Sequence, residues 1–149
     1  MNPFLMRPDE RTASWKALRE EVRLLDDAAA LKLVSEYWAK APVSKMAYDP
    51  EDHASWPSPW EMVHAGDWCP SSIAIGMEFT LRLGGWDASR LKLVLIRDYD
   101  ISEQIMVLKI DESLVLNYSV GYVEEYPKTN HDVLISYQND GKRYFVIAK

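Results

Sequence analysis

Cys69 is the residue of this chain best suited to covalent chemistry. It lies between Gly66-Asp67-Trp68 and Pro70-Ser71-Ser72, where a helical pattern begins. The N-terminus of a helix carries roughly half a positive charge, and this charge stabilises a thiolate, the form of cysteine that attacks carbonyl carbon. Cys69 is therefore a candidate nucleophile. The alternative is that Cys69 is simply a small, partly buried residue in the loop before the helix.

A cysteine nucleophile also needs a base, and the chain has three histidines. A free thiol is only a few per cent ionised at neutral pH, so thiol enzymes pair it with an imidazole that takes the proton. His53 lies in a proline-rich loop, His64 on a short helical turn and His131 at the start of a strand-like segment. We expect each of them to lie away from Cys69 as an ordinary loop or surface residue.

Apolar periodicity divides the chain into a helical first half and a strand-rich second half. Helical spacing is found in residues 14–25, 26–39, 60–65 and 71–83, and glycines end the last of these segments. Strand-like runs cover residues 91–96, 104–110, 114–117, 131–137 and 143–148. Asn139-Asp140-Gly141 is typical of a hairpin turn. Helices followed by strands predict an α+β fold with an antiparallel sheet.

Composition excludes several classes of function. The 149 residues fit a single domain, residues 1–149, and the net charge of −6 argues against nucleic-acid binding. With one cysteine there is no internal disulfide and no paired Cys/His metal signature, so we expect neither metal nor cofactor. No segment has the apolar length of a membrane helix or a signal peptide, which predicts a cytoplasmic protein without membrane contact.

Several short motifs resemble the bacterial transglutaminase-like cysteine peptidases. Trp56-Pro57-Ser58-Pro59-Trp60-Glu61 is similar to the Trp-x-Thr-Pro-x-Glu element of that family, and Gly66-Asp67-Trp68-Cys69 stands where the family has Gly-Asp-Cys-Glu-Asp. The helix over residues 74–84 resembles one that ends in Leu-Arg-x-Leu-Gly. The similarity continues through Met106-Val107-Leu108 and Leu114-Val115-Leu116-Asn117, and covers residues 14–148.

The resemblance implies a papain-like domain with an incomplete catalytic set. Cys69 corresponds to the nucleophile after a one-residue adjustment, because an ungapped count places Pro70 in its slot. Asn117 stands at the family's aspartate, and Ile105 stands at its histidine. We expect Ile105 to project toward the start of the central helix and Gln104 to project from the opposite face of the sheet. Gln104 has no group that titrates near neutrality and is no substitute for histidine.

The function predicted from these residues is non-catalytic. The first hypothesis is an inactive relative that binds a protein or peptide in the former cleft. Its candidate ligand residues are Trp56, Trp60, Trp68 and Gln104. One alternative is an active cysteine hydrolase or acyltransferase with an unconventional base. The other is a structural or oligomer-forming domain whose cleft is filled by tryptophan side chains.

Overall fold

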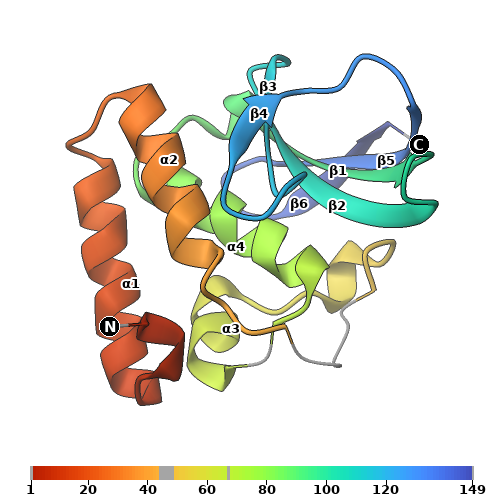
Figure 1. Cartoon of the computed structure of the whole chain (residues 1–149). Helices are drawn as coiled ribbons and strands as arrows, with labels where there is room; N and C mark the ends of the chain where they lie inside the picture. Colours follow the sequence, from red (N-terminus) through yellow and green to blue (C-terminus); the bar gives the residue numbers. More distant parts are fainter. Residues whose placement is uncertain (1, 44–48, 67, 149) are drawn as a thin grey trace.

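A computed structural model describes residues 2–43, 49–66 and 68–148. Its α-helices are α1 (Pro8–Val22), α2 (Asp27–Trp38), α3 (Pro59–Ala65) and α4 (Pro70–Leu83). Its strands are β1 (Leu91–Asp98), β2 (Glu103–Ile110), β3 (Leu114–Leu116), β4 (Val123–Glu125), β5 (His131–Asn139) and β6 (Tyr144–Ala148). Three short 3-10 turns are η1 (Pro3–Leu5), η2 (His53–Ser55) and η3 (Ala88–Arg90). Figure 1 shows the helices on one side of the molecule and the sheet on the other.

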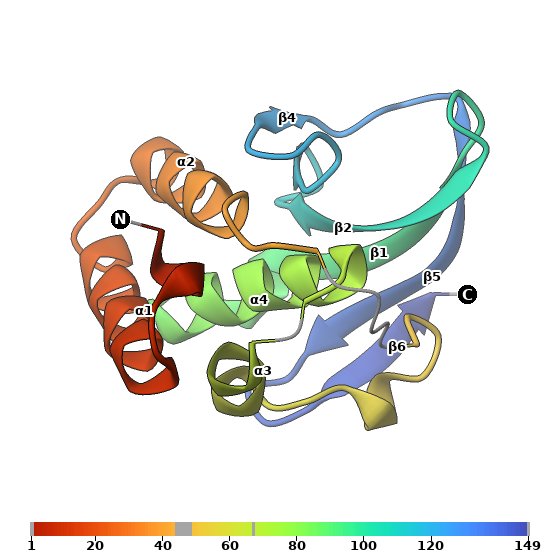
Figure 2. The same ribbon diagram turned by 60° about the horizontal axis from the view of Figure 1, so that its bottom comes forward.

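The strands form one antiparallel sheet in the order β4-β3-β2-β1-β5-β6. The sheet is curved, and α4 lies in its concave side with α1 and α2 packed beyond it (Figure 2). The predicted α+β architecture is therefore confirmed. The segment over residues 71–83 was expected to pack on the sheet as the central helix, and α4 does so.

The middle of α4 is buried on every side. Every residue from Ser72 to Leu81 is buried, so this helix has no solvent-facing stripe over that stretch. Gly76 allows the closest approach, since a Cβ placed there would lie 2.5 Å from the Trp38 ring. A residue larger than glycine at this position would push α2 away from α4.

The hydroxyl of Thr80 joins the three long helices. Its Oγ1 accepts hydrogen bonds from the indole Nε1 of Trp15 on α1 and of Trp38 on α2, both at 3.0 Å. It donates in turn to the carbonyl oxygen of Gly76 at 2.6 Å. One donor and two acceptor positions are all that a hydroxyl offers, so this buried group is fully used.

The sheet has an apolar layer on each face. The face toward α4 carries Leu93, Leu95, Met106 and Leu108, which belong to the main core. On the other face Val94, Ile96, Val107 and Val115 form a second cluster. The partly buried side chains packed against this second cluster are Ile105, Tyr118 and Tyr126. Successive residues of β2 therefore alternate between two apolar environments.

The structure departs from the predicted segments in two places. α1 begins at Pro8, six residues before the predicted start at Ser14. Proline suits the first helical position, and Asp9 and Glu10 in the first turn complement the helix dipole. The short strand β4 was not predicted, because Val123 is its one apolar residue. The predicted hairpin at Asn139-Asp140-Gly141 is confirmed as the β5–β6 turn.

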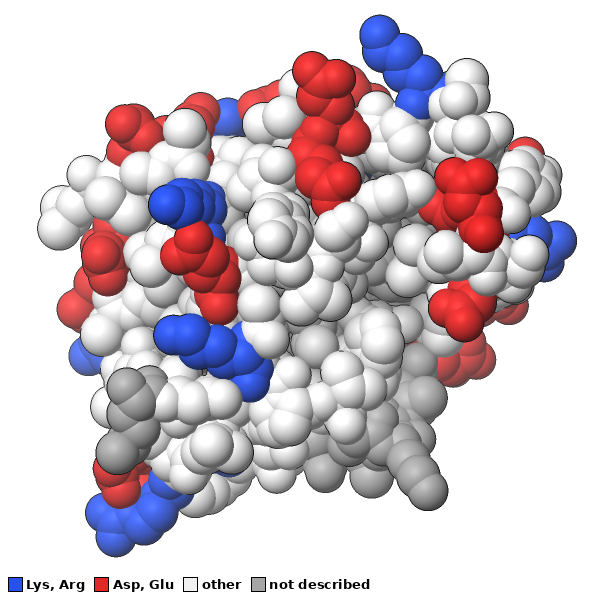
Figure 3. All heavy atoms as spheres, in the orientation of Figure 1, with Lys and Arg blue, Asp and Glu red and all other residues white. Residues whose placement is uncertain are grey.

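The surface shows no concentration of basic charge on the face in Figure 3. Among the described residues there, Lys and Arg lie singly between Asp and Glu. No helix in the described part of the chain has the length and apolar character needed to cross a membrane.

The Thr80 junction generates a test of stability. In Thr80→Val the shape of the side chain is kept, but two buried indole N–H groups lose their acceptor. We expect the free energy of unfolding to fall by about 2–4 kcal/mol, because each unsatisfied buried donor costs about 1–3 kcal/mol. Thr80→Ser keeps the hydroxyl and should cost only about 1 kcal/mol. Urea denaturation of both variants measures the difference, and equal losses would show that the hydroxyl does not hold the helices.

Candidate functional site

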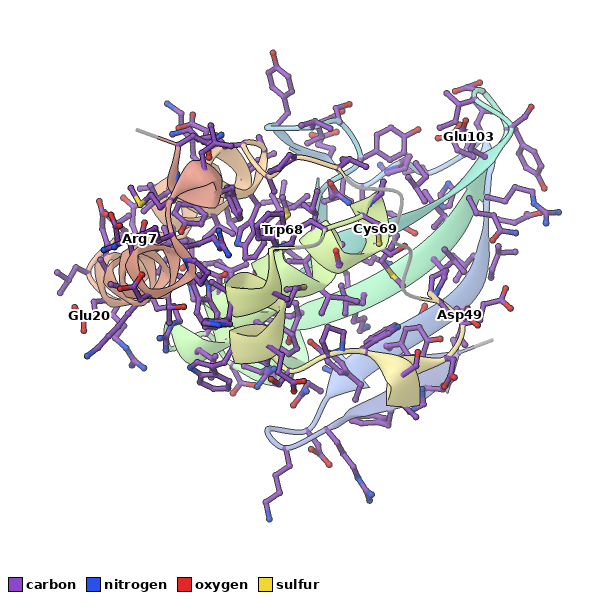
Figure 4. All side chains as sticks on the ribbon, turned by 90° about the horizontal axis from the view of Figure 1, so that it is seen from below. Arg7, Glu20, Asp49, Trp68, Cys69 and Glu103 are labelled. Carbon is purple, nitrogen blue, oxygen red and sulfur yellow. The ribbon has the colours of Figure 1, made fainter. Side chains whose placement is uncertain are left out.

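Cys69 lies at the start of α4 and is almost closed to solvent. Its exposed fraction is 4%. Its backbone N–H donates to Ser72 Oγ at 2.8 Å, and the same hydroxyl donates to the Cys69 carbonyl at 3.0 Å. Ser72 thus holds the first turn of the helix around the cysteine. Figure 4 shows Cys69 between the helices and the sheet.

Asn117 is held beside the same helix terminus. Its φ of 67° lies in the left-handed region, which asparagine tolerates better than most residues. Its Nδ2 donates to the carbonyl oxygens of Pro70 at 3.1 Å and Met106 at 3.0 Å. These bonds tie the end of β3 to both α4 and β2. Through the bond to Pro70, the side chain of Asn117 lies next to the residue that follows Cys69.

The expected direction of Ile105 is wrong. Its side chain packs against the cluster on the sheet face that turns away from α4. Met106 belongs to the core on the α4 side, and by strand alternation Gln104 shares that side. Gln104 is solvent-exposed near the start of β2. The resemblance of Met106-Val107-Leu108 to the residues that follow the family histidine therefore assigns Ile105 to the wrong face of the sheet.

None of the three histidines hydrogen-bonds the Cys69 thiol, and all three lie in the described part of the chain. The ring of His53 packs against Tyr137, with ring centroids 5.4 Å apart. His64 is exposed on α3. His131 bonds the hydroxyl of Tyr126 at 3.2 Å, at the end of β5 that pairs with Asp98. In the described part of the chain, no imidazole forms a hydrogen bond at the start of α4.

The tryptophans predicted to line one cleft lie in different places. Trp68 is buried in the helical core, where its ring meets Phe4 edge-on at 4.8 Å and Arg11 lies 5.2 Å from its centre. Its assignment to a ligand cleft is therefore wrong. Asp67 of the Gly-Asp-Trp-Cys motif lies outside the described residues.

Trp56 and Trp60 line a groove at the other end of α4. The groove has a volume of about 690 Å³ and lies between the segment of η2 and α3 and the β5–β6 hairpin. Figure 2 shows these two segments side by side. Arg82 reaches it from α4, thirteen residues after Cys69, which is about 20 Å along a helix. Trp60 is 50% exposed there, and Trp56 packs on Tyr144 with centroids 5.2 Å apart.

A buried charged network forms one wall of this groove. Glu78 is 1% exposed and accepts from Arg82 Nε at 3.0 Å and from the hydroxyl of Tyr144. Burial raises the pKa of Glu78, whereas Arg82 beside it favours the charged carboxylate. Burial also raises the pKa of Tyr144 well above its usual value, and the neighbouring carboxylate adds to this effect. Tyr144 therefore stays a neutral donor. Sequence patterns gave no signal for this network.

Metal-binding geometry is not found in the described ranges. Within residues 2–43, 49–66 and 68–148, no three His, Cys, Asp or Glu side chains come together as a metal site requires.

The backbone is similar to that of solved structures of LapG from Legionella pneumophila, a bacterial transglutaminase-like cysteine protease. One structure of LapG superposes with a TM-score of 0.72 at 19% identity, covering 93% of this chain and 78% of LapG. The EGTA-treated form gives 0.72 at 18% identity over the same shares. The calcium-bound form gives 0.71 at 16%, covering 90% and 76%. The chain has the transglutaminase-like fold. No profile of a protein family matches the sequence, and no curated protein does.

Within the transglutaminase-like fold, Asn117 generates a prediction on stability and pH. In Asn117→Asp a carboxylate faces the carbonyls of Pro70 and Met106 in place of an amide donor. We expect the free energy of unfolding at pH 7 to fall by about 2–3 kcal/mol. The pKa of the new carboxyl should be raised in the folded state, so the loss should shrink as pH falls toward about 4, where the unfolded chain also protonates.

The matched control is Asn130→Asp. Asn130 also has a positive φ, 65°, but its side chain is exposed. Urea unfolding of both variants at pH 7 and pH 4.5 separates the two causes. An equal loss at the two positions would assign the effect to backbone conformation and remove the role given to the two carbonyl contacts.

Proposed function

We propose that this chain is a catalytically inactive relative of the transglutaminase-like cysteine peptidases and serves to bind a protein or peptide. The observation that carries the first half of this proposal is the surroundings of Cys69. The cysteine begins the central helix of a transglutaminase-like fold, yet His53, His64 and His131 all lie elsewhere.

Without an imidazole, the steps of thiol catalysis have no proton acceptor or donor. The base takes the thiol proton during attack and returns a proton to the leaving group. Gln104 and Met106 lie on the α4 side of β2. Neither side chain has a group that titrates near neutral pH, so neither can take the thiol proton or protonate the leaving group. Asn117, which stands at the aspartate position, uses its amide hydrogens on two backbone carbonyls. The remaining group is a buried thiol at a helix terminus.

The second half of the proposal concerns the surface that binds. Cys69 and Trp68 are buried, so the binding site is assigned to the groove of Trp56 and Trp60. An exposed aromatic platform beside fixed polar groups suits a peptide side chain. This assignment moves the ligand from the former cleft to the opposite end of α4.

A purely structural role is the second candidate, and it too has an observation in its favour. Trp68 fills the space beside the start of α4 and packs on Phe4, as expected of a cleft that has become core. The groove lined by Trp56 and the half-exposed Trp60 favours binding over this alternative, because it offers a concave apolar surface with polar groups beside it.

The proposal predicts no turnover that depends on Cys69. Purified protein should hydrolyse labelled casein, and transfer the acyl group of a glutamine-containing peptide to an amine, no faster than Cys69→Ala. Loss of a general base alone costs about 10²-fold or more in rate, and loss of one member of a coupled catalytic set costs much more. Turnover in the native chain that disappears in Cys69→Ala would overturn the inactive assignment.

A further inference from the structure

Basic side chains line the groove beside Trp56 and Trp60, although the chain as a whole is acidic. Arg82, Lys142 and Arg143 line it, and none of its lining residues is Asp or Glu. The whole chain carries a formal charge of −6. Arg82 is already paired with the buried Glu78, so the cations that the groove offers to a ligand are chiefly Lys142 and Arg143.

The acidic residue closest in sequence to the two hairpin cations is already bound by backbone. The Oδ1 of Asp140 accepts from the backbone N–H of Lys142 at 2.9 Å and of Arg143 at 3.0 Å. These bonds lower the pKa of Asp140, the Arg143 amide contributing most. Within the described residues neither Lys142 nor Arg143 forms a salt bridge. Their side chains are exposed.

Arg82 lines the groove from a fixed position. Its Nε and Nη2 bind Glu78, and the hydroxyl of Tyr144 donates to the same carboxylate. The side chain is only 14% exposed and lines the groove. A guanidinium already held by a buried carboxylate loses little freedom when it binds a second one, so the ordering cost of binding is small.

The apolar part of the groove is also built in advance. Trp56 packs edge-on against Tyr137 at 4.9 Å and Tyr144 at 5.2 Å, and its Nε1 donates to the Asp49 carbonyl at 2.8 Å. Phe79 meets Tyr144 at 5.7 Å. These contacts fix an aromatic wall next to the cations. A ligand for this groove therefore needs an aromatic or large apolar group to pack on the wall, and acidic groups to meet the cations beside it.

We propose that this groove binds an acidic peptide segment that carries an aromatic or large apolar side chain. The side chain packs between Trp56 and Trp60, and the flanking carboxylates contact Lys142 and Arg143. The proposal rests on the proposed function, that the chain binds a protein or peptide, and specifies the ligand. Charge complementarity selects the acidic residues, and burial against the aromatic wall supplies affinity.

The test uses three fluorescein-labelled peptides and fluorescence anisotropy. The acidic aromatic probe is Gly-Glu-Asp-Phe-Leu-Asp-Glu-Gly, the neutral probe replaces its acids by Gln and Asn, and the third replaces Phe-Leu by Ala-Ala. We expect the acidic aromatic probe to bind about tenfold more tightly than either of the others, the scale of two partly exposed charge pairs or one buried side chain.

Two double variants with the same change of charge locate the site. Lys142→Glu/Arg143→Glu should lower the affinity for the acidic aromatic probe about tenfold or more, because attraction becomes repulsion. Lys32→Glu/Lys40→Glu, at exposed positions outside the groove, should leave it within about twofold. Thermal melts of both variants check that each is folded. An equal effect of the two double variants would overturn the location.

The remaining outcomes separate this inference from the proposed function. If the neutral and acidic probes bind equally and Trp60→Ala abolishes both, the chain is a peptide-binding domain and the acidic preference is wrong. If none of the three peptides binds, the groove is not a peptide site, and the peptide-binding half of the proposed function falls with it. If a thymidylate octamer binds more tightly than the acidic probe, the ligand class is wrong. None of these binding outcomes bears on the inactivity of Cys69, which the turnover assay with Cys69→Ala tests separately.

Discussion

The hydroxyl of Thr80 is the constraint on which the arrangement of the helices depends. A helix buried on every side must satisfy its polar groups internally, and this one hydroxyl satisfies two indoles and is satisfied by one carbonyl. Trp38 can reach it only because Gly76 leaves room for its ring. The position of α4 relative to α1 and α2 is therefore set in the middle of the helix, and both ends of α4 are positioned by that junction.

The two ends of α4 have become different environments. At its start, Ser72 and Asn117 close the backbone around Cys69, and Trp68 packs into the core beside it. At its other end, Arg82 reaches the groove between the η2–α3 segment and the β5–β6 hairpin. The fold does not need an imidazole on β2, because the apolar residues of both sheet faces stabilise that strand. A β2 strand without histidine is therefore compatible with the same fold.

Periodicity predicted the elements well and their facing directions less well. Strands that are polar on one face reveal their register through alternation, but β2 is apolar on both faces, so its pattern could not check the direction that the family resemblance gave to Ile105. The tryptophans raise the same difficulty. The sequence alone does not distinguish Trp68, which is buried, from Trp60, which is half-exposed. No sequence pattern singles out Lys142 and Arg143, and only the three-dimensional position of the hairpin makes them part of a groove.

The network of Glu78, Arg82 and Tyr144 connects the stability of the fold to the groove. A carboxylate that is 1% exposed would cost several kcal/mol without partners, so Arg82 and Tyr144 are required by Glu78 whatever else they do. The same two side chains form the wall of the groove. A substitution that removes the cation from the groove wall therefore also leaves a buried charge unpaired. The start of α4 has no such coupling, because no buried charge there depends on an imidazole. Substitutions at the groove end of α4 are therefore constrained by the buried Glu78, whereas a histidine at the cysteine end would be under no such constraint from folding.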